Sequence, residues 1–307
     1  MFEIRKKYVN SQIEKKEYIA EMYKKHQSLY QYSKLLPETN IKKIEIVDNK
    51  VYMTTRDLDI KLICKEFDER IVPIEMLNFG DYEPQETEML SKILDIINAK
   101  TMVDAGANIG YISMYLGKKH QDMKVYSFEP LKPTFDMLKE NVENNELKNI
   151  NIFNFGLSNK EEDVYFYYYP EGCGNSSLEN LSERNDVQKI MCKTKLLDSV
   201  YAELEEDSLD FIKCDVEGAE FMVFQGAHNV LTEKRPIVFA ELLRKWAKKF
   251  DYVPNDVLDY MSKIGYKCYC IRDEKLVEVK GIDESTLETN FLFFDEEKHK
   301  KVIENLK

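Results

Sequence analysis

The chain has 307 residues, which is enough for one large domain or for one domain with an appendage. Apolar residues make up 43% and charged residues 33%, values that are typical of a folded protein and that exclude a largely disordered chain. The net charge of −12 repels phosphate backbones and therefore argues against a nucleic-acid-binding protein.

Targeting features and cysteine usage predict a cytoplasmic protein. No run of about 18 apolar residues is present, so we expect no transmembrane helix. Residues 1–7 lack the apolar segment of a signal peptide. The six cysteines are scattered and include no C-x-x-C pair, which favours reduced thiols over a disulfide framework or a zinc site.

We expect residues 1–77 to form an N-terminal appendage of helix and small sheet. Apolar and aromatic side chains at helical spacing within 1–35 predict one or two helices. Two short apolar segments flank Asp48-Asn49-Lys50 and predict a β-hairpin, because Asp and Asn tolerate the left-handed backbone of a tight turn. Extended segments are predicted at 44–47, 51–53 and 60–64.

We expect residues 78–307 to form one α/β domain. Strands that alternate with helices indicate a parallel sheet with right-handed crossover connections. Helices are predicted at 84–97, 109–116, 133–144, 219–224 and 257–264. Strands are predicted at 101–104, 125–128, 150–155, 164–169 (antiparallel), 209–214, 237–240, 266–271 and 290–294.

The segment Asp104-Ala105-Gly106-Ala107-Asn108-Ile109-Gly110 joins a predicted strand to a predicted helix, and ligands of α/β sheets bind at such turns. Gly106 allows the backbone to approach a ligand, Gly110 allows the helix to pack tightly against the strand, and Asp104 can attract an ammonium group. Asn108 stands where NAD-binding loops have their second glycine. The segment therefore fits S-adenosylmethionine (SAM), which carries an ammonium group, better than a dinucleotide. A purely structural turn is the alternative.

Glu129 ends the next predicted strand, within Phe128-Glu129-Pro130. An acidic residue at this place is positioned to accept hydrogen bonds from both ribose hydroxyls of a nucleoside. The alternative is a carboxylate that stabilises the start of the following helix through the helix dipole. The two roles are compatible, and we favour nucleoside binding.

Six short motifs follow one another along the chain. They are Tyr82-Glu83-Pro84, Val103-Asp104-Ala105-Gly106-Ala107-Asn108-Ile109-Gly110, Phe128-Glu129-Pro130, Thr194-Lys195-Leu196-Leu197-Asp198, Ile212-Lys213-Cys214-Asp215-Val216-Glu217-Gly218-Ala219-Glu220 and Gly226-Ala227. In order and spacing, from 78 to 294, this set resembles the FkbM-type SAM-dependent methyltransferases. The combination is far more specific than any single motif.

The resemblance implies a class I methyltransferase, Rossmann-like fold. Its sheet has seven strands in the order 3-2-1-4-5-7-6, and strand 7, here 290–294, is antiparallel. It also implies SAM as the cofactor and a hydroxyl oxygen of a sugar or secondary metabolite as the usual acceptor. The implied cofactor contacts are Asp104, Gly106, Asn108 and Gly110 for methionine, Glu129 and Pro130 for ribose, Gly156 and Leu157 for adenine, and Glu83 beside the loop.

Methyl transfer to a hydroxyl requires an in-line arrangement and a group that takes the proton. Asp215 follows the predicted strand 209–214, and Glu217 lies two residues further on. This pair is our candidate for the base, or for the ligands of a divalent metal that acidifies the hydroxyl. Capping of the next helix is the alternative for Asp215. Glu241 also faces the cleft, and its alternative is an ion pair with Arg244.

Other polar groups are weaker candidates. We expect the four histidines, His26, His120, His228 and His299, to face solvent rather than to act in catalysis. The segment 167–177 is aromatic and rich in small polar residues, and it is either a loop over the cleft or an edge strand with an ordinary turn.

The sequence thus predicts a SAM-dependent O-methyltransferase that acts on a small hydroxylated acceptor, such as a saccharide or nucleotide-sugar. A nicotinamide-dependent oxidoreductase and a non-catalytic nucleoside-binding module on the same fold are the alternatives. We expect no nucleic-acid partner. The appendage would complete the pocket or mediate a homodimer.

Overall fold

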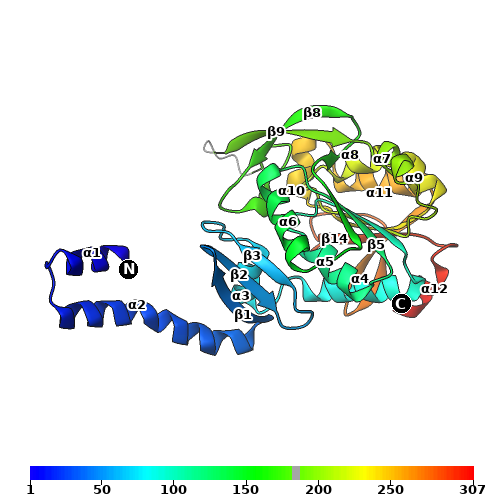
Figure 1. Cartoon of the computed structure of the whole chain (residues 1–307). Helices are drawn as coiled ribbons and strands as arrows, with labels where there is room; N and C mark the ends of the chain where they lie inside the picture. Colours follow the sequence, from blue (N-terminus) through cyan, green and yellow to red (C-terminus); the bar gives the residue numbers. More distant parts are fainter. Residues whose placement is uncertain (182–186) are drawn as a thin grey trace.

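The computed structural model describes residues 1–181 and 187–307, and its first two helices form an arm. Helices α1 (Phe2–Val9) and α2 (Lys15–Leu35) extend away from the body of the molecule (Figure 1), and each of their residues is at least partly exposed. The rings of Tyr8 and Tyr18 stack with centroids 4.4 Å apart and join the two helices. The prediction of one or two helices within 1–35 is confirmed.

A small antiparallel sheet follows the arm. Its strands, in order, are β1 (Ile41–Val47), β2 (Lys50–Thr55) and β3 (Lys61–Cys64). The predicted hairpin is confirmed, because Asp48 and Asn49 take φ angles of 50° and 63° between β1 and β2. Two consecutive left-handed residues form the turn that matches the twist of a two-residue hairpin.

The small sheet shares a hydrophobic core with the rest of the chain. Leu62 of β3 belongs to the same buried cluster as Leu90 of α4 (Pro84–Ile97). The backbone amide of Ile63 donates to the side chain of Asn141 in α6 (Lys132–Asn144) at 2.8 Å. Helix α3 (Val72–Phe79), which was not predicted, runs across the boundary proposed at residue 77.

In the described residues, the central sheet has eight strands, one more than the seven predicted. The order is β13 (Lys275–Val279), β12 (Tyr266–Arg272), β14 (Asn290–Asp295), β11 (Ile237–Glu241), β10 (Phe211–Cys214), β4 (Thr101–Ala105), β5 (Lys124–Phe128) and β6 (Ile150–Phe153). The strands from β11 to β6 are parallel, and β14 runs antiparallel to both of its neighbours.

The extra strand, β13, forms a hairpin with β12 at the sheet edge. Its turn consists of Asp273 and Glu274, whose φ angles are 49° and 61°, and contains no glycine or asparagine. The usual turn signal is therefore missing from the sequence, and this is why the strand was not predicted.

Helices cover both faces of the central sheet, which gives a three-layer α/β fold of the class I methyltransferase type. Neighbouring strand residues such as Met102 and Val103 point to opposite faces and belong to different buried clusters. One face carries α4, α5 (Tyr111–Lys119), α6 and α12 (Lys300–Leu306). The other carries α7 (Leu197–Leu204), α8 (Glu220–Gln225), α9 (His228–Glu233), α10 (Arg244–Ala247) and α11 (Pro254–Lys263).

A third sheet lies beside the carboxyl ends of the parallel strands. Its order is β7 (Gly156–Leu157), β9 (Gln188–Lys195) and β8 (Glu162–Tyr168), and β8 and β9 are antiparallel (Figure 1). The segment predicted as one strand at 150–155 therefore ends earlier, at Phe153, and the chain enters the third sheet at Gly156. The antiparallel strand predicted at 164–169 is confirmed as β8.

Two further expectations concern membranes and thiols. Within the described residues, no helix combines the length and the apolar character needed to span a bilayer. The six cysteines are all free thiols, and five of them are buried.

Candidate active site

A cavity of about 350 Å³ opens at the carboxyl ends of the parallel strands. This size and place are usual for a small-molecule site in an α/β protein. Ten of the twelve predicted site residues line it: Glu83, Gly106, Asn108, Glu129, Pro130, Gly156, Leu157, Asp215, Glu217 and Glu241. Asp104 and Gly110 are not among the residues that line it.

Glu129 is held by two backbone amides at the end of β5. Its side-chain oxygens accept hydrogen bonds from the amide of Asn108 at 3.1 Å and from that of Leu131 at 2.9 Å. Each carboxylate oxygen has two acceptor positions, so one remains on each oxygen for a ligand. Burial raises the pKa of Glu129 to about 7, and the two amide donors partly oppose this rise.

Gly106 is required by the protein chain itself. Its φ angle is 78°, and a Cβ atom at this position would lie 1.8 Å from the backbone oxygen of Asp215. The loop after β4 and the loop after β10 therefore touch through this glycine. Gly106 also lines the cavity, so its expected approach to a ligand stays a prediction.

Gly110 begins α5 and packs it against another helix. Its φ angle is 85°, and a Cβ atom there would lie 2.3 Å from Cδ1 of Leu138 in α6. The prediction of close packing is confirmed, but the partner is α6 rather than a strand. Gly110 has no place in the cavity wall.

Asp104 pairs with a lysine of the protein. Parallel pairing of β4 and β10 places Lys213 directly beside Asp104, and Nζ lies 3.3 Å from Oδ1. Ser113 donates to the other carboxylate oxygen at 2.5 Å. Both side chains of the ion pair are buried, with 6% and 1% exposed. The ammonium group that Asp104 meets is thus that of Lys213, which sequence reasoning missed although it is the one charged residue in the apolar strand 211–214.

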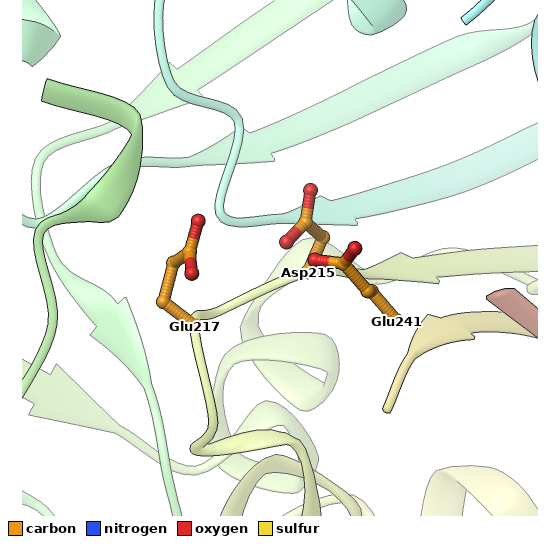
Figure 2. A group of neighbouring side chains, drawn as sticks. All are labelled: Asp215, Glu217 and Glu241. Carbon is orange, nitrogen blue, oxygen red and sulfur yellow. The ribbon is translucent and has the colours of Figure 1, made fainter. Parts of the chain in front are cut away.

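Asp215, Glu217 and Glu241 form an acidic cluster at the ends of β10 and β11 (Figure 2). One oxygen of each lies within 4.8 Å of the others. Burial and the nearby Asp215 carboxylate raise the pKa of Glu241 to about 8, and they also raise the pKa of Glu217. Glu217 and Glu241 therefore resist carrying negative charge beside Asp215.

The capping role considered for Asp215 is not observed, because no described side chain caps the first turn of α8, and the loop before this helix is held by Glu220. Its Oε1 atom accepts hydrogen bonds from the backbone amides of Val216 at 3.0 Å and Gly218 at 3.1 Å. Asp215 contacts Lys213 instead, at 3.4 Å. In the described part of the chain, no ion pair joins Glu241 to Arg244. The carboxylates of Asp215 and Glu241 therefore both remain available to the cavity.

Glu83 adds a fourth acidic group beside this cluster. Burial and Asp215 raise its pKa to about 7. Glu83, Asn108 and Glu217 all line the cavity with left-handed backbone, at φ angles of 45°, 51° and 54°. Such conformations cost about 1–3 kcal/mol each for residues other than glycine and gather at functional sites.

The family model described as the methyltransferase FkbM domain matches residues 104–268, which is more than half of the chain. The chain belongs to this family. The matched region contains the loop after β4, Glu129 and the acidic cluster, but not Glu83.

Individual relatives cover the chain only in part. The chain is 30% identical over 173 residues to methyltransferase sdnD of Sordaria araneosa, across 47% of this chain and 67% of that protein. It is 26% identical over 223 residues to the AMB antimetabolite synthetase AmbE of Pseudomonas aeruginosa, across 56% of this chain but only 10% of that protein. A solved methyltransferase FkbM from Methylobacillus flagellatus aligns with 17% identity and a TM-score of 0.42, over 64% of this chain and 44% of that one.

In this FkbM family member, the segment after β8 covers the cavity. Cys173, Gly174 and Ser176 line it from above, and the Cys173 thiol donates to Oδ1 of Asn108 at 3.6 Å. The backbone amide of Cys173 donates to the buried carboxylate of Asp68 at 3.3 Å. Both interpretations of 167–177 hold in part, because Tyr167 and Tyr168 end the edge strand β8 and the residues after them line the cavity. The anchoring role of Asp68 had no signal in the sequence.

The mouth of the cavity carries residues that sequence reasoning missed. Arg70 and Glu75 form an ion pair on one side, and Lys245 lies over the ring of Trp246, 3.9 Å from its centroid, on the other. Trp246 is the only tryptophan in the chain, and it follows the end of β11 by five residues.

The prediction that the histidines face solvent is wrong for His299, and His120 is also largely covered, with 12% of its side chain exposed. His299 is 4% exposed, and its Nδ1 atom accepts a hydrogen bond from the backbone amide of Asp295 at 3.0 Å. Burial lowers its pKa to about 4, so it is a neutral core residue rather than a solvent-facing one. His299 is not among the residues that line the cavity.

Proposed function

We propose that this protein transfers the methyl group of SAM to a hydroxyl oxygen of a small acceptor. The observation that carries the proposal is Glu129, a buried carboxylate with two free acceptor positions, in the same cavity as the acidic cluster. A nucleoside diol and a reacting hydroxyl thus have separate, chemically suitable places in one site.

The cofactor half of the site would lie between β4 and β6. Glu129 would accept hydrogen bonds from both ribose hydroxyls, and Gly156 and Leu157 would contact adenine. The methionine part would lie along Gly106 and Asn108, close to Glu83. Since Asp104 is already paired with Lys213, we assign the ammonium group to the carboxylates that face the cavity. The same carboxylates disfavour the pyrophosphate of a nicotinamide dinucleotide.

The acceptor half would lie between the acidic cluster and the mouth. As the acceptor oxygen bonds to the methyl carbon, the C–S bond breaks, its electron pair passes to sulfur, and the hydroxyl proton passes to a carboxylate. Asp215, Glu217 and Glu241 are the candidates for that carboxylate.

A saccharide-like acceptor suits this half for two reasons. Several carboxylates within one cavity can accept hydrogen bonds from several hydroxyl groups. Trp246 at the mouth offers an apolar ring face against which a sugar ring can pack.

The division of the chain into an appendage (1–77) and a methyltransferase domain (78–307) belongs to the same proposal. The exposed arm of α1 and α2 supports a separate role for the N-terminal residues, and the shared core of the small sheet ties that part to the site. Ile19, Tyr23, Leu29 and Tyr30 are exposed on α2, which supports our proposal of a homodimer.

The test is calorimetric titration with S-adenosylhomocysteine (SAH), followed by a methyl-transfer screen of hydroxylated acceptors with and without EDTA. We expect one binding site for SAH per chain, and strongly weakened binding in Glu129→Ala. If SAH does not bind, or if Glu129→Ala binds it as tightly as the natural protein does, the ribose assignment and the proposed function fail.

A further inference from the structure

The acidic cluster has the composition and spacing of a site for a hard cation. Its three carboxylates come from the loop after β10 and from the end of β11, and Figure 2 shows them gathered in one place. Their nearest oxygens lie within 4.8 Å of one another. Oxygens that each lie about 2.0–2.6 Å from a common divalent cation are themselves about 3–5 Å apart.

Glu217 supplies an independent observation. Its Oε2 atom is buried, and it has no hydrogen-bond partner among the described residues. A buried polar atom without a partner costs about 1–3 kcal/mol, and more when it belongs to a charged group. The backbone of Glu217 is also left-handed, and its carbonyl accepts a hydrogen bond from Ser177 at 2.8 Å. The chain thus holds this side chain in a costly arrangement that a bound cation would satisfy.

Among the described residues, the ion pairs of the cluster are limited to one with Lys213. Lys213 also contacts Asp104 at 3.3 Å and the carbonyl of Gly106 at 3.4 Å. Its contact with the cluster is a single 3.4 Å approach to Asp215. Within the described residues, neither Glu217 nor Glu241 forms an ion pair.

We propose that Asp215, Glu217 and Glu241 bind a divalent cation, Mg²⁺ or Mn²⁺, at the acceptor end of the cavity. Carboxylate oxygens are the preferred ligands of these ions, which also keep positions open for water or substrate oxygens. Resting on the proposed function, we assign one open position to the acceptor hydroxyl. This assignment restricts the acceptor to oxygen-rich molecules, such as those with neighbouring hydroxyl groups.

The first measurement is Mn²⁺ binding to the full chain, without cofactor or acceptor, by calorimetry and by the loss of the free-ion paramagnetic resonance signal. We expect one saturable site per chain. Glu217→Gln and Glu241→Gln should each weaken binding by roughly 100-fold or more, because residues that only orient metal ligands already contribute about 10- to 100-fold. Glu75→Gln is the matched control. It removes the same charge from the same cavity, where Glu75 is paired with Arg70, and it should bind Mn²⁺ normally.

A second measurement locates the ion. Tb³⁺ bound at the cluster should emit when Trp246 is excited, because this single tryptophan lines the same cavity. Mn²⁺ should quench this emission by displacing Tb³⁺. In EDTA, both glutamine variants should melt at least as high as the natural protein, since each removes one repelling charge. Lost binding would then not reflect lost folding.

Three results overturn the proposal: no saturable Mn²⁺ binding, equal affinity in both glutamine variants and the natural protein, or Tb³⁺ emission that persists in those variants. Selective binding of methylammonium in place of Mn²⁺, with the same dependence on Glu217 and Glu241, would also overturn it and indicate a cationic acceptor. SAH binding separates the two proposals. Intact SAH binding without Mn²⁺ binding rejects the metal site alone, and Mn²⁺ binding without SAH binding rejects the proposed function alone.

Discussion

Replacement of Lys213 by methionine tests how the cofactor loop is held. The change keeps the length and apolar stem of the side chain, but it leaves the Asp104 carboxylate buried with Ser113 as its remaining partner. At the observed separation of 3.3 Å, the attraction between the two charges is about 5 kcal/mol at an effective dielectric constant of about 20. Part of this energy only offsets the cost of burying the charges.

We therefore expect Lys213→Met to lower the free energy of unfolding by about 3–5 kcal/mol, the range for removal of one partner from a buried ion pair. The double variant with Asp104→Asn removes both charges, and we expect it to be roughly 2 kcal/mol more stable than Lys213→Met alone. Asp104→Asn alone should cost less than Lys213→Met, because Lys213 keeps its contact with Asp215.

Urea denaturation at neutral pH, followed by circular dichroism, measures all four proteins in one double-mutant cycle. A loss of less than about 1 kcal/mol in Lys213→Met would refute the reasoning, because such a value is typical of a solvent-screened surface pair. A double variant no more stable than Lys213→Met would refute it as well.

Three further predictions concern the cavity wall. Below pH 7 the Glu129 carboxyl of the free protein holds a proton, since burial raises its pKa to about 7. SAH affinity should therefore fall by up to about tenfold for each pH unit below 7. An SAH affinity that does not change with pH in the natural protein, or the same pH dependence in Glu129→Gln, would contradict this. Gly106→Ala should lower the free energy of unfolding by about 3 kcal/mol, because the alanine would need a left-handed backbone and would clash with the chain. The control Gly174→Ala, whose Cβ atom would lie 3.5 Å from its nearest neighbour, should lose less than about 1 kcal/mol. Equal melting temperatures of the two variants would contradict this. Asp215→Asn should bind SAH normally but lose methyl transfer by roughly 100-fold or more, and normal turnover would remove Asp215 from the chemistry.

Local patterns determined much of the fold. The period-2 and period-3.6 distribution of apolar side chains predicted the parallel strands and the long helices, because burial on one face is a property of each element by itself. The turns were predictable only where their residues carry a conformational preference. The residues Asp48 and Asn49 predicted their hairpin, because both tolerate a left-handed backbone. Glu274, in the turn Asp273-Glu274, adopts the same backbone without such a preference, and β13 was not predicted.

Strand ends were also informative about the site. In a parallel sheet, carboxyl-terminal strand ends lie along one edge, so residues that follow separate strands converge wherever the strands themselves are placed. Glu129, Asp215 and Glu241 were predictable for this reason, and all three line the cavity. Asp68 and Trp246 follow no such rule, because one lies in the N-terminal region and the other on a short helix, and neither was found.

The partner of each polar group was decided only by the tertiary structure. Asp104 was expected beside an ammonium group, but the register between β4 and β10 supplies that group from Lys213 within the protein. Gly106 was expected to approach a ligand, and its missing side chain also makes room for the backbone of Asp215. The amino-acid sequence determined which residues stand at the ends of its strands, because that depends on local periodicity. Which of them touch depends on register and loop contact between distant segments, and this is set by packing of the whole molecule.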